Sequence, residues 1–427
     1  MDRSGRAQGA LPEAATAPSA APPDVVNLER RVKRHVHAPV HGWFAACAPG
    51  VEPVLVVEAR ALGLEDVAAI PGGVTFWGKL EAGYRANLHL RTANRVWLRV
   101  MDFSARAPED VYREAHECPW EAFLPAGVPL LVQASTSRSR LFGGGFLGRP
   151  LRDAIARHLR ALGLPDPTWV DSPAEEVVDE SDPETSPVPL QRLLARLDGN
   201  RLTLSLDSSG ELLHRRGFRL EHGGAPLRET LAATILLAAG YDGTRVLADP
   251  MCGSGTFGVE AAAIARHLPP GRSRDFLFRH WPSDRAATWE HLRRLAGVAA
   301  LDAAPAPILC RDVDATVLDL ARSHAMRAGV GPDIRFEAAD FFTTPAPDLP
   351  PGLVVLNPPY GLRQDAGDDP VAFFRRVGRR LTSAWWGWSV AVVAPSPAAA
   401  DALGLRAPRH LHLSHGGLRV TVVLAQA

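Results

Sequence analysis

The chain has 427 residues, 46% of them hydrophobic, and its 47 Lys and Arg residues formally balance its 47 Asp and Glu residues. This length predicts two or more domains, and the neutral charge gives no overall basic excess that would indicate nucleic-acid binding. No apolar run is long enough to span a membrane, and the N-terminus lacks the apolar segment of a signal peptide, so we expect a cytoplasmic protein. The four cysteines form no C-x-x-C pair, which argues against a zinc site and a disulfide framework; we expect no metal.

The first 42 residues are expected to form a tail. Residues 1–24 are rich in Ala, Pro, Ser and Gly, a composition that predicts disorder. A basic run from Arg30 to His35 follows. It is equally compatible with a solvated segment and with a contact to RNA.

Residues 43–107 alternate between strand and helix patterns, which predicts a small α+β sandwich. The expected strands are Trp43–Cys47, Val74–Trp77 and Val96–Val100, and the expected helices are Val54–Ala61 and Leu80–Leu90.

Residues 108–212 form a second alternating segment. The expected elements are the helix Pro108–His116, the strand Leu130–Ala134, the helix Leu151–Leu162, and a hairpin that turns at Asp198–Gly199. Residues 165–189 differ, because seven carboxylates and no Lys or Arg lie between Asp171 and Glu184. We interpret this stretch as a solvated acidic loop.

Two arginines, Arg138 and Arg140, lie beside a run of glycines just before the expected helix at 151. Such a loop at the start of a helix can bind phosphate groups. The alternative is a mobile hairpin with two exposed arginines.

A glycine turn follows the apolar segment that ends at Asp249. Gly253 and Gly255 lie between this buried strand and a helix, as in the nucleotide-binding turn of a doubly wound α/β sheet. Asp249 is expected at the carboxyl end of the strand, where such sheets bind their ligands. No G-x-x-x-x-G-K-[ST] motif occurs, so an adenosyl group without phosphates is favoured.

Two further strands end in acidic residues. Asp312 follows Ile308–Arg311, the position at which this architecture binds ribose hydroxyls, whereas Asp314 is expected to be a helix N-cap. Asp340 ends the strand that begins at Ile334 and is suited to the adenine amine. Its alternative role is that of a cap or turn residue.

The sequence Asn357-Pro358-Pro359-Tyr360 ends a fourth buried strand, because proline cannot extend it. The Asn357 side-chain oxygen and the Pro358 carbonyl can each accept a hydrogen from an exocyclic amine, which directs the nitrogen lone pair toward a methyl donor. The fixed φ of both prolines holds that carbonyl in place. The Tyr360 ring can stack on the base. These features predict methyl transfer to a planar nitrogen.

The chain resembles the bacterial THUMP-domain RNA guanine methyltransferases, which act on the exocyclic amine of guanine in large-subunit ribosomal RNA. The matching segments are Pro71–Gly78, Tyr84–Arg95, Ser205–Arg219, Ala225–Ala233, Asp249–Thr256 and Asn357–Arg363. The resemblance implies an α/β protein with a Rossmann-like class I methyltransferase domain at 213–427. A ferredoxin-like subdomain (43–107) and a THUMP RNA-binding domain (108–212) precede it.

The resemblance also implies S-adenosyl-L-methionine as cofactor and RNA as partner. The residues expected to bind the cofactor are Asp249, Pro250, Cys252, Gly253, Ser254, Gly255, Thr256, Asp312 and Asp340, and the resemblance adds Pro226 and Glu229 at the wall of the pocket. Arg363 joins Arg138 and Arg140 as a candidate RNA contact. One departure from the family pattern is Arg311, which stands where a Ser or Gly is usual.

Several alternatives stay open. The same chemistry could serve a transfer RNA guanine, and a DNA adenine or a protein glutamine amide could also use Asn357–Tyr360. Neither of the last two explains the N-terminal half. A measurement of which cofactor binds would distinguish a dinucleotide oxidoreductase from a methyltransferase. A non-catalytic RNA-binding module would require a broken active site.

Overall fold

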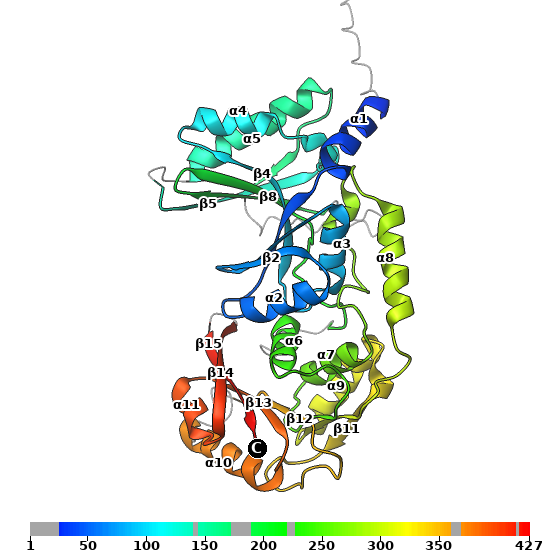
Figure 1. The fold of residues 1–427 in the computed structure, drawn as a ribbon, viewed down its shortest axis with the longest axis vertical. Helices are drawn as coiled ribbons and strands as arrows, with labels where there is room; N and C mark the ends of the chain where they lie inside the picture. Colours follow the sequence, from blue (N-terminus) through cyan, green and yellow to red (C-terminus); the bar gives the residue numbers. More distant parts are fainter. Residues whose placement is uncertain (1–24, 140–143, 172–188, 220–226, 360–368, 416–417) are drawn as a thin grey trace, which may run out of the picture.

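A computed structural model describes residues 25–139, 144–171, 189–219, 227–359, 369–415 and 418–427. Within these ranges the chain forms two β-sheets with flanking helices, one in each half of the sequence (Figure 1).

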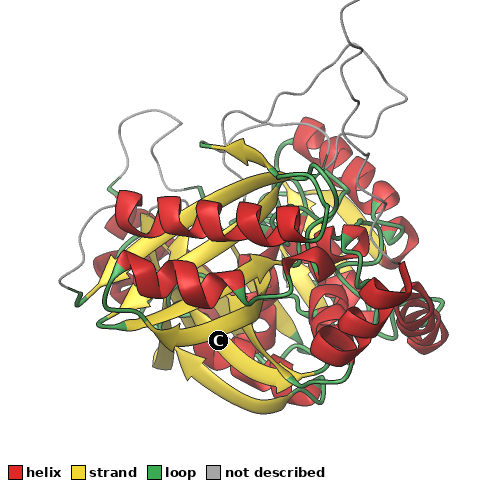
Figure 2. Ribbon diagram, turned by 90° about the horizontal axis from the view of Figure 1, so that it is seen from above, coloured by secondary structure: helices red, strands yellow, loops and turns green. Residues whose placement is uncertain are grey.

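The N-terminal sheet has the strand order β2-β3-β1-β4-β8-β7-β5-β6. Its strands are β1 (His41–Ala46), β2 (Glu65–Ile70), β3 (Gly73–Gly78), β4 (Arg95–Ser104), β5 (Pro129–Ser137), β6 (Thr168–Val170), β7 (Gln191–Asp198) and β8 (Arg201–Asp207). Its helices are α2 (Glu52–Ala61), α3 (Leu80–His89), α4 (Pro108–His116) and α5 (Gly144–Ala161). Figure 2 shows the longer helix α5 and the shorter α4 side by side across the strands. Because β4 pairs with β8, a single sheet runs across the boundary expected near residue 107.

Most expected elements of this half are confirmed, including the helix Pro108–His116 and the hairpin β7–β8. Two strands were missed. β2 is an edge strand whose residues are mostly exposed, so it lacks the alternation of a half-buried strand. β6 has only three residues and lies inside the expected loop 165–189, so the prediction of a loop over that whole range was wrong in part. Helix α5 also begins earlier than expected, at Gly144, with Pro150 inside it.

The expectation of a tail up to residue 42 was wrong in part. Residues Val25–Val32 form helix α1, and a π-helix continues it over Lys33–His37. Val32 and Val36 are buried, and the Arg31 Nε donates to Glu121 Oε1 over 2.6 Å. The helix that carries the basic run is therefore packed on the N-terminal sheet domain, while Arg30, Lys33, Arg34 and His35 remain exposed on it.

The C-terminal sheet has the order β11-β10-β9-β12-β13-β15-β14. Its strands are β9 (Leu247–Asp249), β10 (Ile308–Asp312), β11 (Ile334–Ala338), β12 (Leu353–Leu356), β13 (Ser389–Ala394), β14 (Arg406–His415) and β15 (Leu418–Gln426). Its helices are α6 (Glu229–Ala238), α7 (Thr256–Ala265), α8 (Ala286–Ala299), α9 (Ala315–Arg327), α10 (Pro370–Ala384) and α11 (Pro397–Ala402). Strands β9 to β13 pair in parallel, and β15 is antiparallel to β13. Every residue of β12 is buried, as in a parallel strand with both faces covered.

The segment between α7 and β10, which belongs to the C-terminal half, packs against the N-terminal half. Its backbone amides at Gly271, Phe278 and Ser283 donate to the N-terminal carbonyls of Leu88, Ser208 and Ala122. The ring of Tyr84 in α3 stacks on Phe278, with 4.1 Å between centroids. Trp289 of α8 packs edge-on against both rings.

A buried ionic cluster adds to this junction. Glu260 of α7 pairs with Arg216, at 3.2 Å, and lies 3.9 Å from Arg91, which follows α3. The Arg91 guanidinium also donates to the carbonyl of Ala263 over 3.2 Å. Burial lowers the pKa of Arg91 to about 10, so the side chain remains charged at neutral pH. Packing and charge thus join the two halves into one body.

Among the helices in the described ranges, none is both long and apolar enough to cross a membrane.

Candidate active site

Four polar residues lie at the carboxyl ends of four neighbouring parallel strands. Asp312 ends β10 and Asp249 ends β9, while Asp340 follows β11 and Asn357 follows β12. The spatial order is β11-β10-β9-β12: β10 and β11 are added on one side of β9, and the following strand β12 is added on its other side. Open α/β sheets bind ligands at such a switch point. The predicted convergence of these strand ends is therefore observed.

Glycine is favoured at two positions of the turn after β9, for different structural reasons. Gly253 and Gly255 adopt φ values of 51° and 81°, in the left-handed region that favours glycine. A Cβ on Gly255 would lie 3.0 Å from the Cβ of Ala321 in α9, whereas a Cβ on Gly253 would meet nothing within 4 Å. The open side of Gly253 leaves space for a ligand against the backbone.

Gly258 is a third glycine at the spacing G-x-G-x-x-G. A Cβ there would lie 2.4 Å from the Sγ of Cys310, so glycine allows α7 to pack closely on β10. This complete spacing also occurs in dinucleotide-binding proteins. Spacing alone therefore does not exclude a dinucleotide, and the nature of the ligand depends on the surrounding residues.

The end of β10 holds this turn in place. The Cys252 amide donates to the Arg311 carbonyl and the Gly253 amide to Asp312 Oδ2, each over 2.9 Å. Asp312 Oδ1 accepts from the amide of Asp314 over 3.1 Å. These bonds fix the Asp312 carboxylate, and each oxygen keeps capacity for a ribose hydroxyl. Asp314 itself caps α9, as predicted.

Asp249 is 1% exposed, and burial raises its pKa well above the usual range. A hydrogen bond from the Met251 backbone to the Asp249 carboxyl opposes this rise in pKa, while the nearby charge of Asp312 adds to it. Asp249 Oδ1 has no hydrogen-bond partner within the described part of the chain. Because a buried polar atom without a partner is costly, this oxygen fits a ligand that donates a hydrogen bond.

The other predicted residues of the turn have mainly structural contacts. Pro250 is buried, and the Cys252 thiol lies against Cys310 in the core. The Ser254 carbonyl lies 3.0 Å from the Nδ1 of His324 in α9. These contacts shape the turn and leave Gly253 as its open point.

Asp340 makes the turn contact that we had given as its alternative role. Its Oδ1 accepts from the amide of Phe342 over 2.8 Å, and its carbonyl accepts from the Thr344 amide. The side chain is half-buried, and its contact with adenine stays a prediction.

Asn357 directly follows the last residue of β12 and is half-buried. Pro358 is buried and Pro359 is exposed. The remaining assigned residues of this region, Tyr360 and Arg363, lie outside the described residues, as do Pro226 and Arg140.

Sequence reasoning missed Arg219, which links two residues assigned to the cofactor. Its guanidinium lies 3.2 Å from Glu229 Oε1, at the start of α6, and donates to the Thr256 hydroxyl at the start of α7. Burial raises the pKa of Glu229, and Arg219 only partly offsets this rise. A buried carboxylate that is charged is costly without a cation nearby. The expected place of Glu229 in the pocket wall could therefore have directed attention to the basic segment that ends at Arg219.

The departure at Arg311 has a local explanation. Arg311 is the cross-strand neighbour of Glu337 in β11, and its Nε donates to that carboxylate over 2.9 Å. It also donates to the Pro345 carbonyl. Its side chain is thus directed along the sheet toward β11.

Arg138 belongs to the other sheet, where it directly follows β5. It adopts a positive φ of 51°, and its Nε donates to Asp198 Oδ1 over 2.8 Å. Its side chain remains 80% exposed. An RNA phosphate at Arg138 would therefore compete with Asp198.

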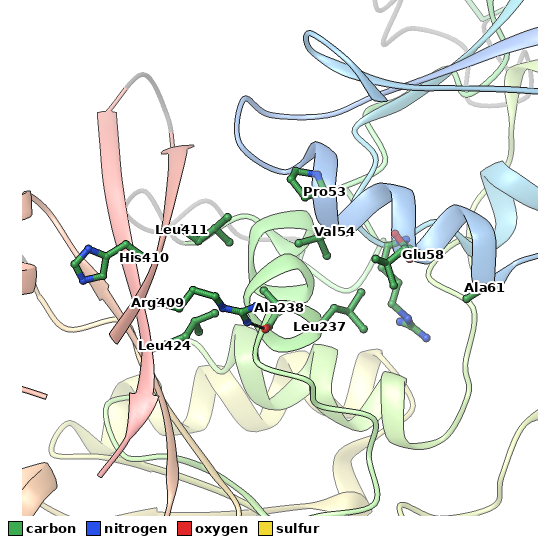
Figure 3. A pocket seen from close by; sticks show the side chains of 12 residues that line it. Pro53, Val54, Glu58, Ala61, Leu237, Ala238, Arg409, His410, Leu411 and Leu424 are labelled. Atoms are coloured by element: carbon green, nitrogen blue, oxygen red, sulfur yellow. Dashed lines mark hydrogen bonds between the residues drawn. The ribbon is translucent and has the colours of Figure 1, made fainter. Parts of the chain in front are cut away.

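A cavity of about 560 Å³ lies at the junction of the two halves and not at the strand ends. Figure 3 shows its lining from α2 (Pro53, Val54, Glu58), the end of α6 (Leu237, Ala238) and the strands β14 and β15 (Arg409, His410, Leu411, Leu424). No assigned cofactor residue lines it. In the described part of the chain no three His, Cys, Asp or Glu side chains are grouped to hold a metal.

Comparisons with known families match both halves. Residues 216–423 match the family described as "RMKL-like, methyltransferase domain". Residues 43–97 match the "RlmL ferredoxin-like domain".

Curated relatives carry the name "Ribosomal RNA large subunit methyltransferase K/L". The protein from Syntrophotalea carbinolica is 36% identical over 390 residues, covering 88% of this chain and 52% of the relative. The protein from Marinobacter nauticus is 35% identical over 398 residues, covering 90% and 52%. The chain thus spans about half the length of the curated relatives it matches.

Solved structures give the same picture. SMU.472, described as a putative methyltransferase complexed with SAH, is 27% identical with a TM-score of 0.77, covering 91% of this chain and 98% of that one. A predicted N6-adenine-specific DNA methylase from Listeria monocytogenes is 27% identical with a TM-score of 0.75, covering 95% and 98%. This chain therefore carries an RMKL-like methyltransferase domain with a Rossmann-like class I fold, preceded by a ferredoxin-like domain of the RlmL type.

Proposed function

We propose that the chain is an S-adenosyl-L-methionine-dependent methyltransferase that acts on the exocyclic N2 amine of a guanine in large-subunit ribosomal RNA. The arrangement of Asp249, Asp312 and Asn357 at the switch point of the second sheet carries this proposal. The names of the curated relatives support ribosomal RNA as substrate. Such an enzyme would act in the cytoplasm, where ribosomal RNA is made.

The cofactor is proposed to lie against the open side of Gly253. Asp312 would accept hydrogen bonds from the ribose hydroxyls, because its carboxylate is already oriented by two backbone amides. The unpartnered Asp249 Oδ1 would accept from a donor of the cofactor. Arg219 would position the starts of α6 and α7 around it through Glu229 and Thr256.

The cofactor supplies an electrophilic methyl group. Asn357 and the Pro358 carbonyl would each accept one hydrogen of the guanine amine, which turns its lone pair away from the ring and toward that group. The adjacent prolines restrict the backbone and so hold the acceptors in place. A strong base is unnecessary, because the nitrogen proton becomes acidic only after the methyl group has been transferred. The ring of Tyr360 would stack on the extruded base.

The N-terminal half is proposed to select the RNA, with a ferredoxin-like unit at 43–107 and a THUMP unit at 108–212. A guanine in folded RNA presents its amine in the shallow minor groove, so the base must be extruded or already unpaired. The methyltransferase domain contacts only that base and its neighbours, which is too little to choose one site in a long RNA.

The test uses the full chain with methyl-labelled S-adenosyl-L-methionine and unmodified transcripts of large-subunit ribosomal RNA. Small-subunit ribosomal RNA, transfer RNA and duplex DNA serve as parallel substrates. Nucleoside mass spectrometry should identify N2-methylguanosine in the large-subunit transcript only, and Asn357→Ala serves as the inactive control.

A second candidate is DNA adenine methylation, which the name of the Listeria monocytogenes relative suggests. Label in DNA with none in RNA would support it and contradict our proposal. Label in transfer RNA alone would support methylation of a guanine amine but would show that transfer RNA, and not ribosomal RNA, is the substrate.

A further inference from the structure

The N-terminal sheet has one face packed in the core and one outer face. Inward residues such as Trp43, Phe76 and Leu98 are completely buried, and helix α3 lies against Trp43 at Gly83. The alternate residues point the other way, since successive side chains of a strand face opposite sides. On the outer face Trp77 is 46% exposed and Arg196 is exposed.

Aromatic and guanidinium groups form a continuous row on this outer face. Trp77 of β3, Gly42 of β1 and Arg99 of β4 are cross-strand neighbours. A Cβ on Gly42 would lie 3.4 Å from the Trp77 ring and 3.5 Å from Arg99 Cδ, so both side chains converge over this glycine. The Arg99 guanidinium carbon lies 5.8 Å from the centroid of Phe44, in the next row. Trp77, Phe44 and Arg99 thus gather on one part of the outer face, which we call the platform.

The platform also carries positive charge close to further arginines. Burial lowers the pKa of Arg99; Asp102 opposes this shift and the charge of Arg196 adds to it. Arg196 lies on the same face in β7, with β8 between it and β4. Arg201 differs from them, because it pairs with Asp102 at 2.6 Å. Within the described residues neither Arg99 nor Arg196 makes an ion pair. Two cations on one sheet face that also carries aromatic rings are complementary to a polyanion with planar bases.

We propose that the outer face of β3, β1, β4 and β7, defined by Trp77, Phe44, Arg99 and Arg196, binds a single-stranded segment of the RNA substrate. This inference rests on the proposed function and specifies where the RNA lies. Unpaired bases can stack on exposed rings and on arginine planes, whereas a duplex buries its bases. Arg99 and Arg196 would neutralise phosphates between the stacked bases.

The test measures RNA affinity and methylation of the full chain in variants of this outer face. Arg99→Gln/Arg196→Gln should weaken binding of a short single-stranded oligoribonucleotide about 10-fold and lower the log–log salt slope by about 1.4, since each lost phosphate contact on a single strand contributes about 0.7. Trp77→Ala should weaken binding about 5- to 100-fold, and Trp77→Phe should retain most of it.

The matched control is Arg157→Gln/Arg294→Gln, which removes the same charge from exposed positions on helices α5 and α8. Cofactor binding and thermal stability should be unchanged in every variant. If Trp77→Ala does not fold, the arginine pair still decides the question, because Arg196 is exposed, Arg99 is only half-buried, and neither substitution opens a cavity in the core.

The outcomes separate the two proposals. If the wild type methylates ribosomal RNA but the outer-face variants bind and methylate like the control, this face is not the RNA site. Equal competition by a blunt duplex would also overturn the inference, since stacking requires unpaired bases. If the wild type binds RNA through this face but methylates no ribosomal RNA, the proposed function fails and the inference on binding stands.

Discussion

The two sheets of this chain bring functional side chains together in different ways. In the C-terminal sheet, Asp249, Asp312 and Asn357 come from separate parallel strands and meet because all of those strands end at the same edge. In the N-terminal sheet, Trp77 and Arg99 lie within antiparallel strands and meet because alternate residues share a face. Asp249 is 1% exposed, whereas Trp77 is 46% exposed.

This difference matches the size of the ligand that each region can hold. Converging strand ends form a small, partly buried site in which backbone amides and carboxylates can surround one cofactor. A sheet face is open and extended, and it suits a polymer. Chemistry and selection of the substrate are thus assigned to different sheets, which must keep a fixed relative position. The following predictions test that division.

The largest effect is expected at the junction, with Glu260→Ala. This change leaves Arg216 and Arg91 buried without their carboxylate, and breaking a buried ion pair typically costs about 3–5 kcal/mol. Chemical denaturation should show that loss in one transition that includes both halves. Glu290→Ala, in an exposed pair with Arg293 on α8, is the control and should change stability by less than about 1 kcal/mol. Two separate transitions in the wild type would mean that the halves fold independently.

The next largest effect concerns the chemical step. Asn357→Ala should lower turnover by roughly 10²–10³, as for removal of one preorganised polar group that acts in the transition state. Cofactor affinity, measured by calorimetry, should be unchanged. Asn357→Asp keeps an acceptor oxygen and should retain more turnover than the alanine variant. If both variants are equally inactive, the acceptor role assigned to the side-chain oxygen is incorrect.

A smaller effect is expected for Asp312→Ala, which should weaken cofactor binding by about 1.5–3 kcal/mol, the scale of hydrogen bonds to a charged group. Asp314→Ala is the matched control two residues away, because it only caps α9. It should cost about 1 kcal/mol of stability and leave cofactor affinity intact. Equal loss of affinity in both variants would reduce the role of Asp312 to support of the turn.

The sequence predicted the strand ends of the second sheet well because their signals are local. A buried run that ends in Asp249 and a glycine turn, or in Asn357 and two prolines, marks the end of a strand without knowledge of the fold. The parallel architecture then brings those ends together. The N-cap role of Asp314 was likewise readable from its position before a helix.

Other features depended on contacts between distant residues. Arg219 reaches Glu229 and Thr256 only after folding, and Glu260 meets Arg91 across a sequence separation that no local pattern spans. The edge strand β2 lacks alternation, since little of it is buried. The outer face was also missed, because Trp77 and Arg99 become neighbours only through the strand order.

The smallest effect concerns the attachment of α1 to the N-terminal half and depends on pH. Glu121 is 1% exposed at its side chain and accepts from Arg31 and from His158 Nε2, the latter over 2.7 Å. Burial alone would raise the pKa of Glu121, but the hydrogen bonds from His158 and Arg31 outweigh it and lower the pKa. The unfolded chain therefore binds a proton more readily than the folded one. This contribution to stability is complete above the unfolded pKa and is lost as the pH falls through the lower folded pKa.

Arg31→Gln should thus destabilise the protein by only about 1 kcal/mol at neutral pH, because the Arg31 side chain is 35% exposed and its ion pair is screened by solvent. The difference from wild type should shrink as the pH falls and Glu121 becomes protonated. Arg30→Gln, an exposed neighbour on the same helix, should have no effect at any pH. Cofactor affinity should remain that of the wild type, since the change lies in the half that we propose to select the RNA. A difference that stays constant down to acid pH would mean that Arg31 stabilises α1 by packing and not through the Glu121 carboxylate.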